Sequence, residues 1–301
     1  MADDDSEPDL FAAREPPPRA LTRLSPLVRR LVAPNASPFT FNGTCTYIVG
    51  EAKVAVVDPG PDDDAHLSAL LAAVEGKNVE TILITHTHRD HSLGVKKLRA
   101  ATGARVVGAA PFTPSGDGTA GLDSAHDRDY SPDAVLADGE RLQGAGYSIE
   151  AVATPGHCCN HLCFALIEDG ALFSGDHVMA WSTSVVAPPD GSMRAYMASL
   201  EKLRGRSETV YWPGHGGPVV EPQRYLRALI HHRRQREASI LAALGDGPQT
   251  IPALVAKVYV GISPSLTTAA GLSTLAHLED LADRGLVIAE TANGEGRFRL
   301  A

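Results

Sequence analysis

Thr85-His86-Thr87-His88-Arg89-Asp90-His91-Ser92 is the stretch that decides the fold of this 301-residue chain. It follows Thr81-Ile82-Leu83-Ile84, an apolar run typical of a buried strand. Imidazole and carboxylate groups are preferred ligands of zinc and similar ions, at roughly 2.0–2.2 Å. A turn from a strand end into a helix can aim residues 86, 88, 90 and 91 into one pocket. The segment therefore predicts part of a metal site, and the remaining ligands must come from distant segments.

Three further segments carry a metal-type side chain where a predicted strand ends. Each combines that side chain with glycine or proline, which favour a turn. The segments are Thr154-Pro155-Gly156-His157, Ser174-Gly175-Asp176 and Pro213-Gly214-His215-Gly216. Four strand ends of this kind favour one shared metal site over a set of unrelated polar residues.

The order of these segments resembles the metallo-β-lactamase superfamily, whose pattern is His-x-His-x-Asp-His, a distant His, an Asp and a last His. The resemblance implies an α/β fold, the αβ/βα four-layer sandwich. It also implies two divalent metal ions, which we expect to be zinc, with Asp58 supporting the ligands from behind. The implied ligands are His86, His88 and His157 for one ion, Asp90, His91 and His215 for the other, and Asp176 as a bridge.

Several other segments resemble the lactamase-beta-2-like branch of this superfamily over about residues 30 to 301. They are 33–47, Thr154-Pro-Gly-His-x-x-x-His161, 196–200 and 232–237. The resemblance implies a C-terminal winged-helix domain, and animal members of the branch resemble endoribonucleases that act on single-stranded RNA. This chain departs from the branch at Cys45, Cys159 and His177. We expect these three residues to lie close to the substrate pocket.

The chain divides into three parts by composition and periodicity. Residues 1 to about 20 are acidic and proline-containing, and the predicted poorly ordered tail is 1–30. Residues 31–225 interleave strands with helices and predict the catalytic domain. Residues 226–301 predict a linker helix and a winged helix, with helices at 251–258 and about 267–284 and strands at 286–290 and 297–300.

The implied mechanism is hydrolysis by a hydroxide that bridges the two metals. Asp90 or Asp176 is expected to accept a proton during attack, and His161 or His177 to supply one to the leaving group. His161 is also expected to support a metal ligand from behind or to polarise the substrate, with ordinary packing as its alternative. For His177 the alternatives are substrate binding and placement at the surface. Core packing is also the alternative for Tyr196, which resembles a tyrosine of related hydrolases. The histidines outside the motifs are expected to be solvent-exposed, namely His66, His126, His231, His232 and His277.

Composition leaves the substrate open between two classes. Cleavage of single-stranded RNA, the candidate that the resemblance implies first, needs a basic track or aromatic platforms. The net charge is -9, aromatic residues are 5%, and the main basic cluster is Arg233-Arg234-Gln235-Arg236. A thioester or other small carboxylic ester, as hydrolysed by glyoxalase II relatives, requires neither feature. Weak β-lactam turnover and a non-enzymatic nucleic-acid-binding module are the remaining alternatives.

The sequence also predicts where the protein acts. No apolar run approaches the ~20 residues that span a bilayer, and the acidic N-terminus is unlike a secretory signal. We therefore expect a cytoplasmic protein with reduced cysteines and no membrane partner. The predicted recognition helix, 267–283, has no Lys, Asn or Gln, so sequence-specific DNA binding is not expected. The oligomeric state is not indicated by the sequence.

Overall fold

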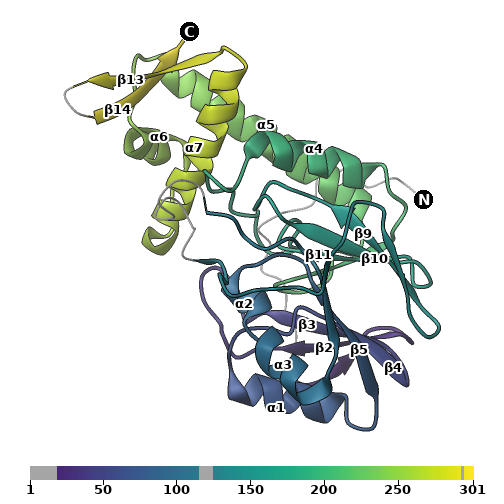
Figure 1. The fold of residues 1–301 in the computed structure, drawn as a ribbon. Coiled ribbons are helices and arrows are strands. Elements are labelled where there is room, and N and C mark those ends of the chain that lie inside the picture. Colours follow the sequence, from purple (N-terminus) through teal and green to yellow (C-terminus); the bar gives the residue numbers. More distant parts are fainter. Residues whose placement is uncertain (1–18, 115–124, 293–294) are drawn as a thin grey trace.

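Two β-sheets face each other and are covered by helices on both outer sides (Figure 1). The computed structural model describes residues 19–114, 125–292 and 295–301. The first sheet has the order β1 (Thr22–Arg23), β2 (Val28–Val32), β3 (Cys45–Gly50), β4 (Lys53–Val57), β5 (Asn78–Ile84), β6 (Arg105–Gly108) and β7 (Ala134–Val135). The second has the order β12 (Val210–Pro213), β11 (Ala171–Gly175), β10 (Leu162–Leu166), β9 (Ser148–Ala153) and β8 (Arg141–Gln143).

The alternation of side chains along the strands produces the four layers. In β4, Ala55 and Val57 point into the core between the sheets, whereas Val54 and Val56 point to the outer face. Successive side chains of a strand point to opposite faces, so a strand that is apolar at every position needs cover on both sides. The cover of the first sheet is α1 (Asp64–Ala73) and α3 (Val95–Thr102). That of the second is α4 (Met193–Arg204) and α5 (Pro222–Leu244). The predicted αβ/βα sandwich is confirmed.

The C-terminal part is a winged helix with its own small core. It contains α6 (Ile251–Val258), a 3-10 turn (Pro264–Leu266), α7 (Thr267–Asp283) and the hairpin of β13 (Val287–Ala292) and β14 (Glu295–Leu300). Leu254, Leu278 and Leu281 pack against the end of α5. The predicted boundary between the catalytic domain and the C-terminal part, at residues 225 and 226, lies inside α5. Because α5 runs through it without a break, the two domains share this helix (Figure 1).

The predicted N-terminal tail is wrong for residues 22–30. Thr22–Arg23 and Val28–Val32 form β1 and β2, and β2 pairs with β3 along its whole length. Val28 is fully buried and Arg30 is 4% exposed, so β2 is an integral strand of the first sheet and not part of a poorly ordered tail. Residues 1–18, the rest of the predicted tail, lie outside the described residues.

The directions of the strands gather the motif segments at one edge of the sandwich. β4 is parallel to β5, and β11 is parallel to β12. β9 and β11 are both antiparallel to β10, so β9 runs in the same direction as β11 and β12. The backbone N–H of Leu162 donates to the carbonyl of Thr85 over 2.7 Å and ties the two sheets together at this edge. The segments that follow β5, β9, β11 and β12 therefore meet.

Among the described residues, no helix is both long and apolar enough to cross a membrane.

Candidate metal centre

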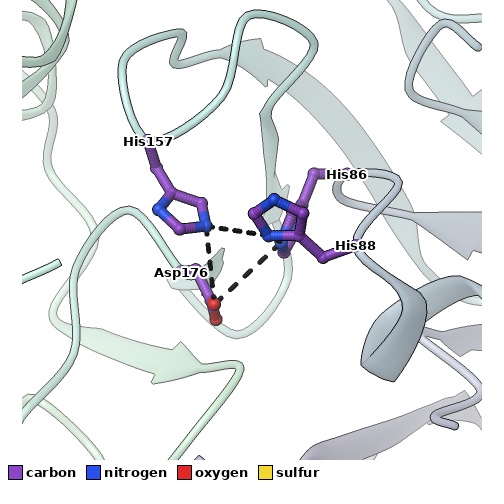
Figure 2. Close-up of side chains that lie close together, drawn as sticks. All are labelled: His86, His88, His157 and Asp176. Carbon is purple, nitrogen blue, oxygen red and sulfur yellow. Dashed lines mark hydrogen bonds and ion pairs between the residues drawn. The ribbon is translucent and has the colours of Figure 1, made fainter. Parts of the chain in front are cut away.

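The first group of candidate ligands consists of three histidines and one carboxylate (Figure 2). His88 Nδ1 lies 3.0 Å from His86 Nε2 and 3.0 Å from His157 Nε2. Asp176 Oδ2 lies 3.7 Å from His157 Nε2 and 4.0 Å from His86 Nε2. Three ring nitrogens and one carboxylate oxygen thus converge on a single point.

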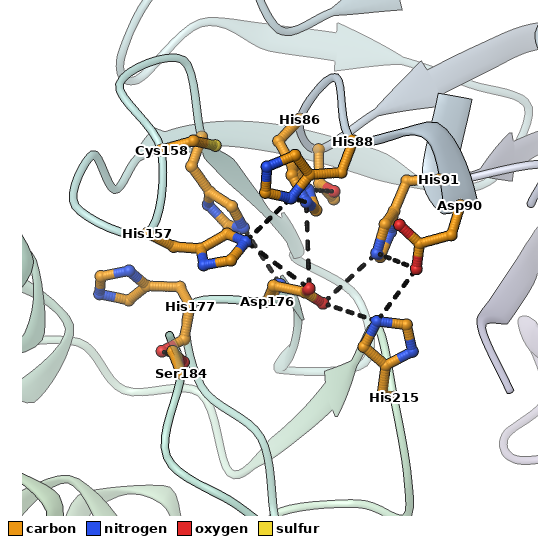
Figure 3. Close-up of polar contacts among 12 residues, drawn as sticks. His86, His88, Asp90, His91, His157, Cys158, Asp176, His177, Ser184 and His215 are labelled. Atoms are coloured by element: carbon orange, nitrogen blue, oxygen red, sulfur yellow. Dashed lines mark hydrogen bonds and ion pairs between the residues drawn. The ribbon is translucent and has the colours of Figure 1, made fainter. Parts of the chain in front are cut away.

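The second group lies on the other side of Asp176 (Figure 3). Asp90 Oδ2 is 3.4 Å from His91 Nε2 and 3.3 Å from His215 Nε2. Asp176 Oδ1 is 3.4 Å from each of the same two nitrogens. One oxygen of Asp176 therefore faces each group, which is the geometry expected of a bridging carboxylate. All seven residues predicted from the sequence are brought together.

The hydrogen bonds on the far side of the histidine rings fix which nitrogen can bind a cation. His157 Nδ1 donates to the carbonyl of Val185 over 2.6 Å, and His86 Nδ1 donates to Thr85 Oγ1 over 3.0 Å. With a proton on each Nδ1 atom, the Nε2 atoms of His86 and His157 carry lone pairs that face the shared ligand group. Buried His91 Nε2 and Asp176 Oδ1 have no hydrogen-bond partner among the described residues. A divalent cation would satisfy all of these atoms, so the donor set fits zinc or a similar ion.

Asp58 holds the ligand segment from behind, as expected. It accepts the backbone N–H of Thr85 over 2.9 Å, the Thr85 hydroxyl over 2.7 Å and His91 Nδ1 over 3.0 Å. Its φ of 50° places it in the left-handed region, where the strand turns away. On the opposite side Thr44 Oγ1 donates to Asp90 Oδ2 over 3.0 Å, a support that the sequence did not indicate.

The two groups differ in charge in the absence of a metal. Burial and neighbouring histidines hold the pKa values of His86 and His88 well below the usual range, so both are neutral. For His215, burial lowers the pKa, but Asp176 and Asp90 outweigh it and raise the pKa to about 9. The same carboxylates raise the pKa of His91 well above its ordinary value despite burial. Without a metal, protons on His91 and His215 thus balance the negative charge of Asp90 and Asp176, which a bound cation would otherwise balance.

We expect metal binding to release protons at pH 7. His215, with a pKa of about 9, is protonated there, and a metal can bind only the neutral ring. Adding zinc to chelator-treated protein should therefore release about one to two protons per chain, and zinc affinity should rise with pH. An indicator dye in weakly buffered solution measures the release. Zinc binding without acidification would contradict this charge distribution.

His161 lies behind Asp176 and does not face the substrate side. Its Nε2 accepts the backbone N–H of Asp176 over 3.2 Å, and its Nδ1 donates to Thr154 Oγ1 over 2.8 Å. It is 1% exposed, and burial together with His177 and His157 keeps its pKa well below the usual range. A neutral ring whose nitrogens are both engaged is poorly suited to supply a proton, so these contacts favour the predicted support of a metal ligand, Asp176, over the predicted acid role.

His177 and Tyr196 also belong to the interior. His177 is fully buried, and burial, His157 and Arg233 lower its pKa to about 3. Tyr196 is fully buried and donates to the His177 carbonyl over 3.0 Å. A solvent-excluded histidine that stays neutral does not fit the predicted proton donor. Cys45 is likewise fully buried, so of the three departures only Cys159 is exposed.

Three of the five histidines expected on the surface are buried, and one of them adjoins the centre. His66, His126 and His277 are between 2% and 4% exposed. The His126 ring lies 4.5 Å from the His88 ring, between Thr87 Oγ1 at 2.8 Å and Asp190 Oδ2 at 3.2 Å. No sequence pattern indicates this burial, because residues 126 and 190 meet only through the tertiary fold.

Gly156 is required for the loop that presents His157. Its φ is 144°, and a Cβ atom would lie 2.3 Å from the Cα of Tyr196. We expect Gly156→Ala to lower the free energy of unfolding by roughly 2–4 kcal/mol, through this clash and backbone strain. Chemical denaturation measures the change. Gly170→Ala is a matched control, because it also has positive φ but only a contact at 4.0 Å. Equal losses in the two variants would contradict the role of the clash.

The fold and the two His/Asp groups are typical of metal-dependent hydrolases. The comparisons with known proteins agree with this class. Residues 39–215 match the metallo-beta-lactamase superfamily, and residues 250–296 match the beta-lactamase associated winged helix domain. The chain therefore belongs to the metallo-beta-lactamase superfamily, in the branch that carries this winged helix, and is a hydrolase of that superfamily.

Individual relatives cover most of the chain. It is 32% identical to a "Beta-lactamase-like protein 2 homolog" of Drosophila melanogaster over 92% of this chain and 95% of that protein. It is 33% identical to an "Atrochrysone carboxyl ACP thioesterase" of Aspergillus fumigatus, over 73% of this chain and 66% of that protein. A metallo-beta-lactamase family protein of Thermus thermophilus is similar in structure, with a TM-score of 0.76, 26% identity and coverage of 93% and 100% of the two chains.

Proposed function

We propose that this protein hydrolyses a thioester or another small carboxylic ester with the help of two divalent metal ions, expected to be zinc. The single observation that carries the proposal is the division of seven buried or half-buried ligands into two groups that share Asp176. The substrate class is supported by the similarity to the thioesterase of Aspergillus fumigatus.

The bound ions would supply an activated water nucleophile and polarise the substrate oxygen. His86, His88 and His157 would hold one ion, and Asp90, His91 and His215 the other, with Asp176 between them. Asp90 is the residue placed to accept a proton from the water, because 28% of its side chain is exposed. Burial raises its pKa, but His91 and His215 lower it well below the usual value and keep the carboxylate ionised.

Single-stranded RNA is not favoured as the substrate, because the main basic cluster does not form an exposed track. On α5, Arg233 is 3% exposed and Arg236 is half-buried over the Tyr259 ring. Arg234 is exposed but lies 3.1 Å from Glu201. Nucleic-acid binding depends on cations that can reach phosphates, and this cluster offers few.

The winged helix serves as a packing module in this proposal and not as a sequence-specific DNA reader. Ala276, Leu278 and Leu281 of α7 are buried, and Asp280 lies 3.0 Å from Arg194 of α4. A helix that is held in this way against the catalytic domain has no free face of Arg, Lys, Asn or Gln for base edges.

A substrate panel tests the proposal. Metal-loaded protein is assayed with short acyl thioesters, a lactone, a β-lactam and unstructured single-stranded RNA. We expect metal-dependent turnover of thioesters and no RNA cleavage. Metal-dependent RNA cleavage that weakens steeply with salt, without thioester turnover, would overturn the proposal.

A further inference from the structure

A cavity of about 490 Å³ lies between the catalytic domain and the winged helix. One wall is the segment 182–185, a second is α5, and the third is formed by the end of α6, the following loop and the start of α7. The volume falls within the range of roughly 300–1,000 Å³ that is typical of small-molecule sites. None of the seven candidate metal ligands lines it, so it is distinct from the metal centre.

The lining of this cavity is cationic although the whole chain carries a net charge of -9. His232, Arg233 and Arg236 contribute basic side chains, and none of the described residues that line the cavity is Asp or Glu. The two arginines also act on their neighbours: after burial, they are the main causes that lower the pKa of His232 to about 4 and of His277 to about 3. The cavity therefore has a positive potential that favours an anion.

Arg233 is a buried cation that lacks a counter-ion among the described residues. It is 3% exposed, and its Nε has no hydrogen-bond partner among the described residues. Its Nη2 donates to the Ser184 carbonyl, and its guanidinium lies 5.0 Å from the centre of the Tyr196 ring. No ion pair joins it to a carboxylate in the part of the chain that the structure describes. A buried charge without a partner is costly, and a bound anion would remove this cost.

Arg236 lies one turn further along α5 and faces the same cavity. It donates to the Val258 carbonyl and stacks over the Tyr259 ring at 4.0 Å. A guanidinium has five N–H donors in a fork that matches carboxylate and phosphate. Among the described residues, each of the two arginines donates one hydrogen bond. Arg234, between them in sequence, points away: its side chain is 67% exposed.

The cavity wall is physically connected to the metal centre. The carbonyl of Val185 accepts His157 Nδ1 over 2.6 Å, and Ser184 Oγ donates to the carbonyl of His177, the residue after Asp176, over 2.9 Å. Figure 3 shows Ser184 and His177 beside His157. A molecule in the cavity would therefore lie across a single backbone segment from a candidate metal ligand.

We infer that the cavity binds the acidic, non-reacting end of the substrate, a phosphate or carboxylate, on Arg233 and Arg236. The apolar residues Ile262, Leu266 and Ala269 accept the carbon chain next to the acid. This inference rests on the proposed function and adds to it: the preferred ester is an anionic one.

Titration of the full metal-loaded chain tests the site independently of turnover. The probes are monobutyl phosphate, hexanoate and neutral hexanol, and calorimetry measures the binding of each. We expect wild-type protein to bind at least one of the two acids and not hexanol. Arg236→Gln should weaken binding about tenfold or more. Arg234→Gln on the same helix should leave it unchanged, and Arg233→Lys, which keeps the buried charge, serves as a second variant. Absence of binding by both acids, or equal binding by wild type and Arg236→Gln, would overturn the inference.

Kinetics separates the two acid sources and links the site to the substrate. S-acetyl phosphopantetheine is compared with S-acetyl pantetheine, and the glutaryl thioester of N-acetylcysteamine with its pentanoyl thioester. In Arg236→Gln, KM should rise about tenfold for an acidic member, with kcat and the neutral members little changed. Equal KM changes for acidic and neutral members would contradict a substrate site. If no thioester is hydrolysed, the proposed function fails, while the titration still decides whether the anion site exists.

Discussion

Replacing Asp176 with alanine is expected to remove bound metal and to lower kcat/KM by more than roughly 1,000-fold, about 4 kcal/mol of transition-state stabilisation. Both of its oxygens face candidate ligands: Oδ2 lies 3.7 Å from His157 Nε2, and Oδ1 lies 3.4 Å from His215 Nε2. Loss of the side chain therefore disturbs both groups at once. Elemental analysis and thioester kinetics on the same preparation measure the two effects.

Asp246→Ala is the matched control for this variant. The Asp246 side chain is 72% exposed and pairs only with Lys257 among the ion pairs of the described residues. Its removal should change neither metal content nor rate, because an exposed pair contributes little. An Asp176→Ala protein that retained two metals and near-normal activity would show that the carboxylate does not bridge.

Asp58→Asn is expected to weaken zinc retention by about 10–100-fold without removing a direct ligand. The Asp58 carboxylate accepts from His91 Nδ1 and twice from Thr85, and an amide offers only one acceptor oxygen in place of two. Asparagine tolerates the left-handed backbone at φ 50°, so the variant tests the carboxylate rather than the turn. Competition with a chromophoric chelator measures the affinity. Unchanged affinity would place Asp58 outside the support of the metal centre.

The seven candidate ligands could be located from sequence because each sits in a short local pattern. Residues 86–91 follow directly on β5, and His157, Asp176 and His215 follow β9, β11 and β12. Strand ends with glycine or proline turns are visible along the chain, and the parallel strand directions of this fold bring them to one edge. The helix at Ile251–Val258 was predicted with the bounds that the structure has.

What the sequence could not provide depends on contacts between distant segments. The pairing of β2 with β3 converts part of the predicted tail into sheet. Burial of His126 depends on Asp190, and burial of His177 depends on α4. A histidine in a polar stretch has no periodic signal that separates an exposed ring from an interior one. For this reason the sequence did not show that His161 and His177 are buried, which disfavours their predicted acid roles.

The cationic cavity illustrates the same limit for function. Arg233, Arg234 and Arg236 belong to the main basic cluster of the sequence, which offers little as a track for nucleic acid. On the helix, Arg233 and Arg236 share a face that the winged helix covers, while Arg234 points to solvent. The packing of α6 and α7 therefore converts a basic patch into a pocket.

Metal dependence tests the central claim most directly. Purified protein is stripped with a strong chelator, its metal content is measured, and zinc is titrated back while thioester hydrolysis is followed in the same samples. We predict that the stripped protein is inactive and that activity returns in proportion to bound zinc, reaching its maximum at two ions per chain, as the two ligand groups that share Asp176 require. Full activity of the wild-type protein without bound metal would contradict it.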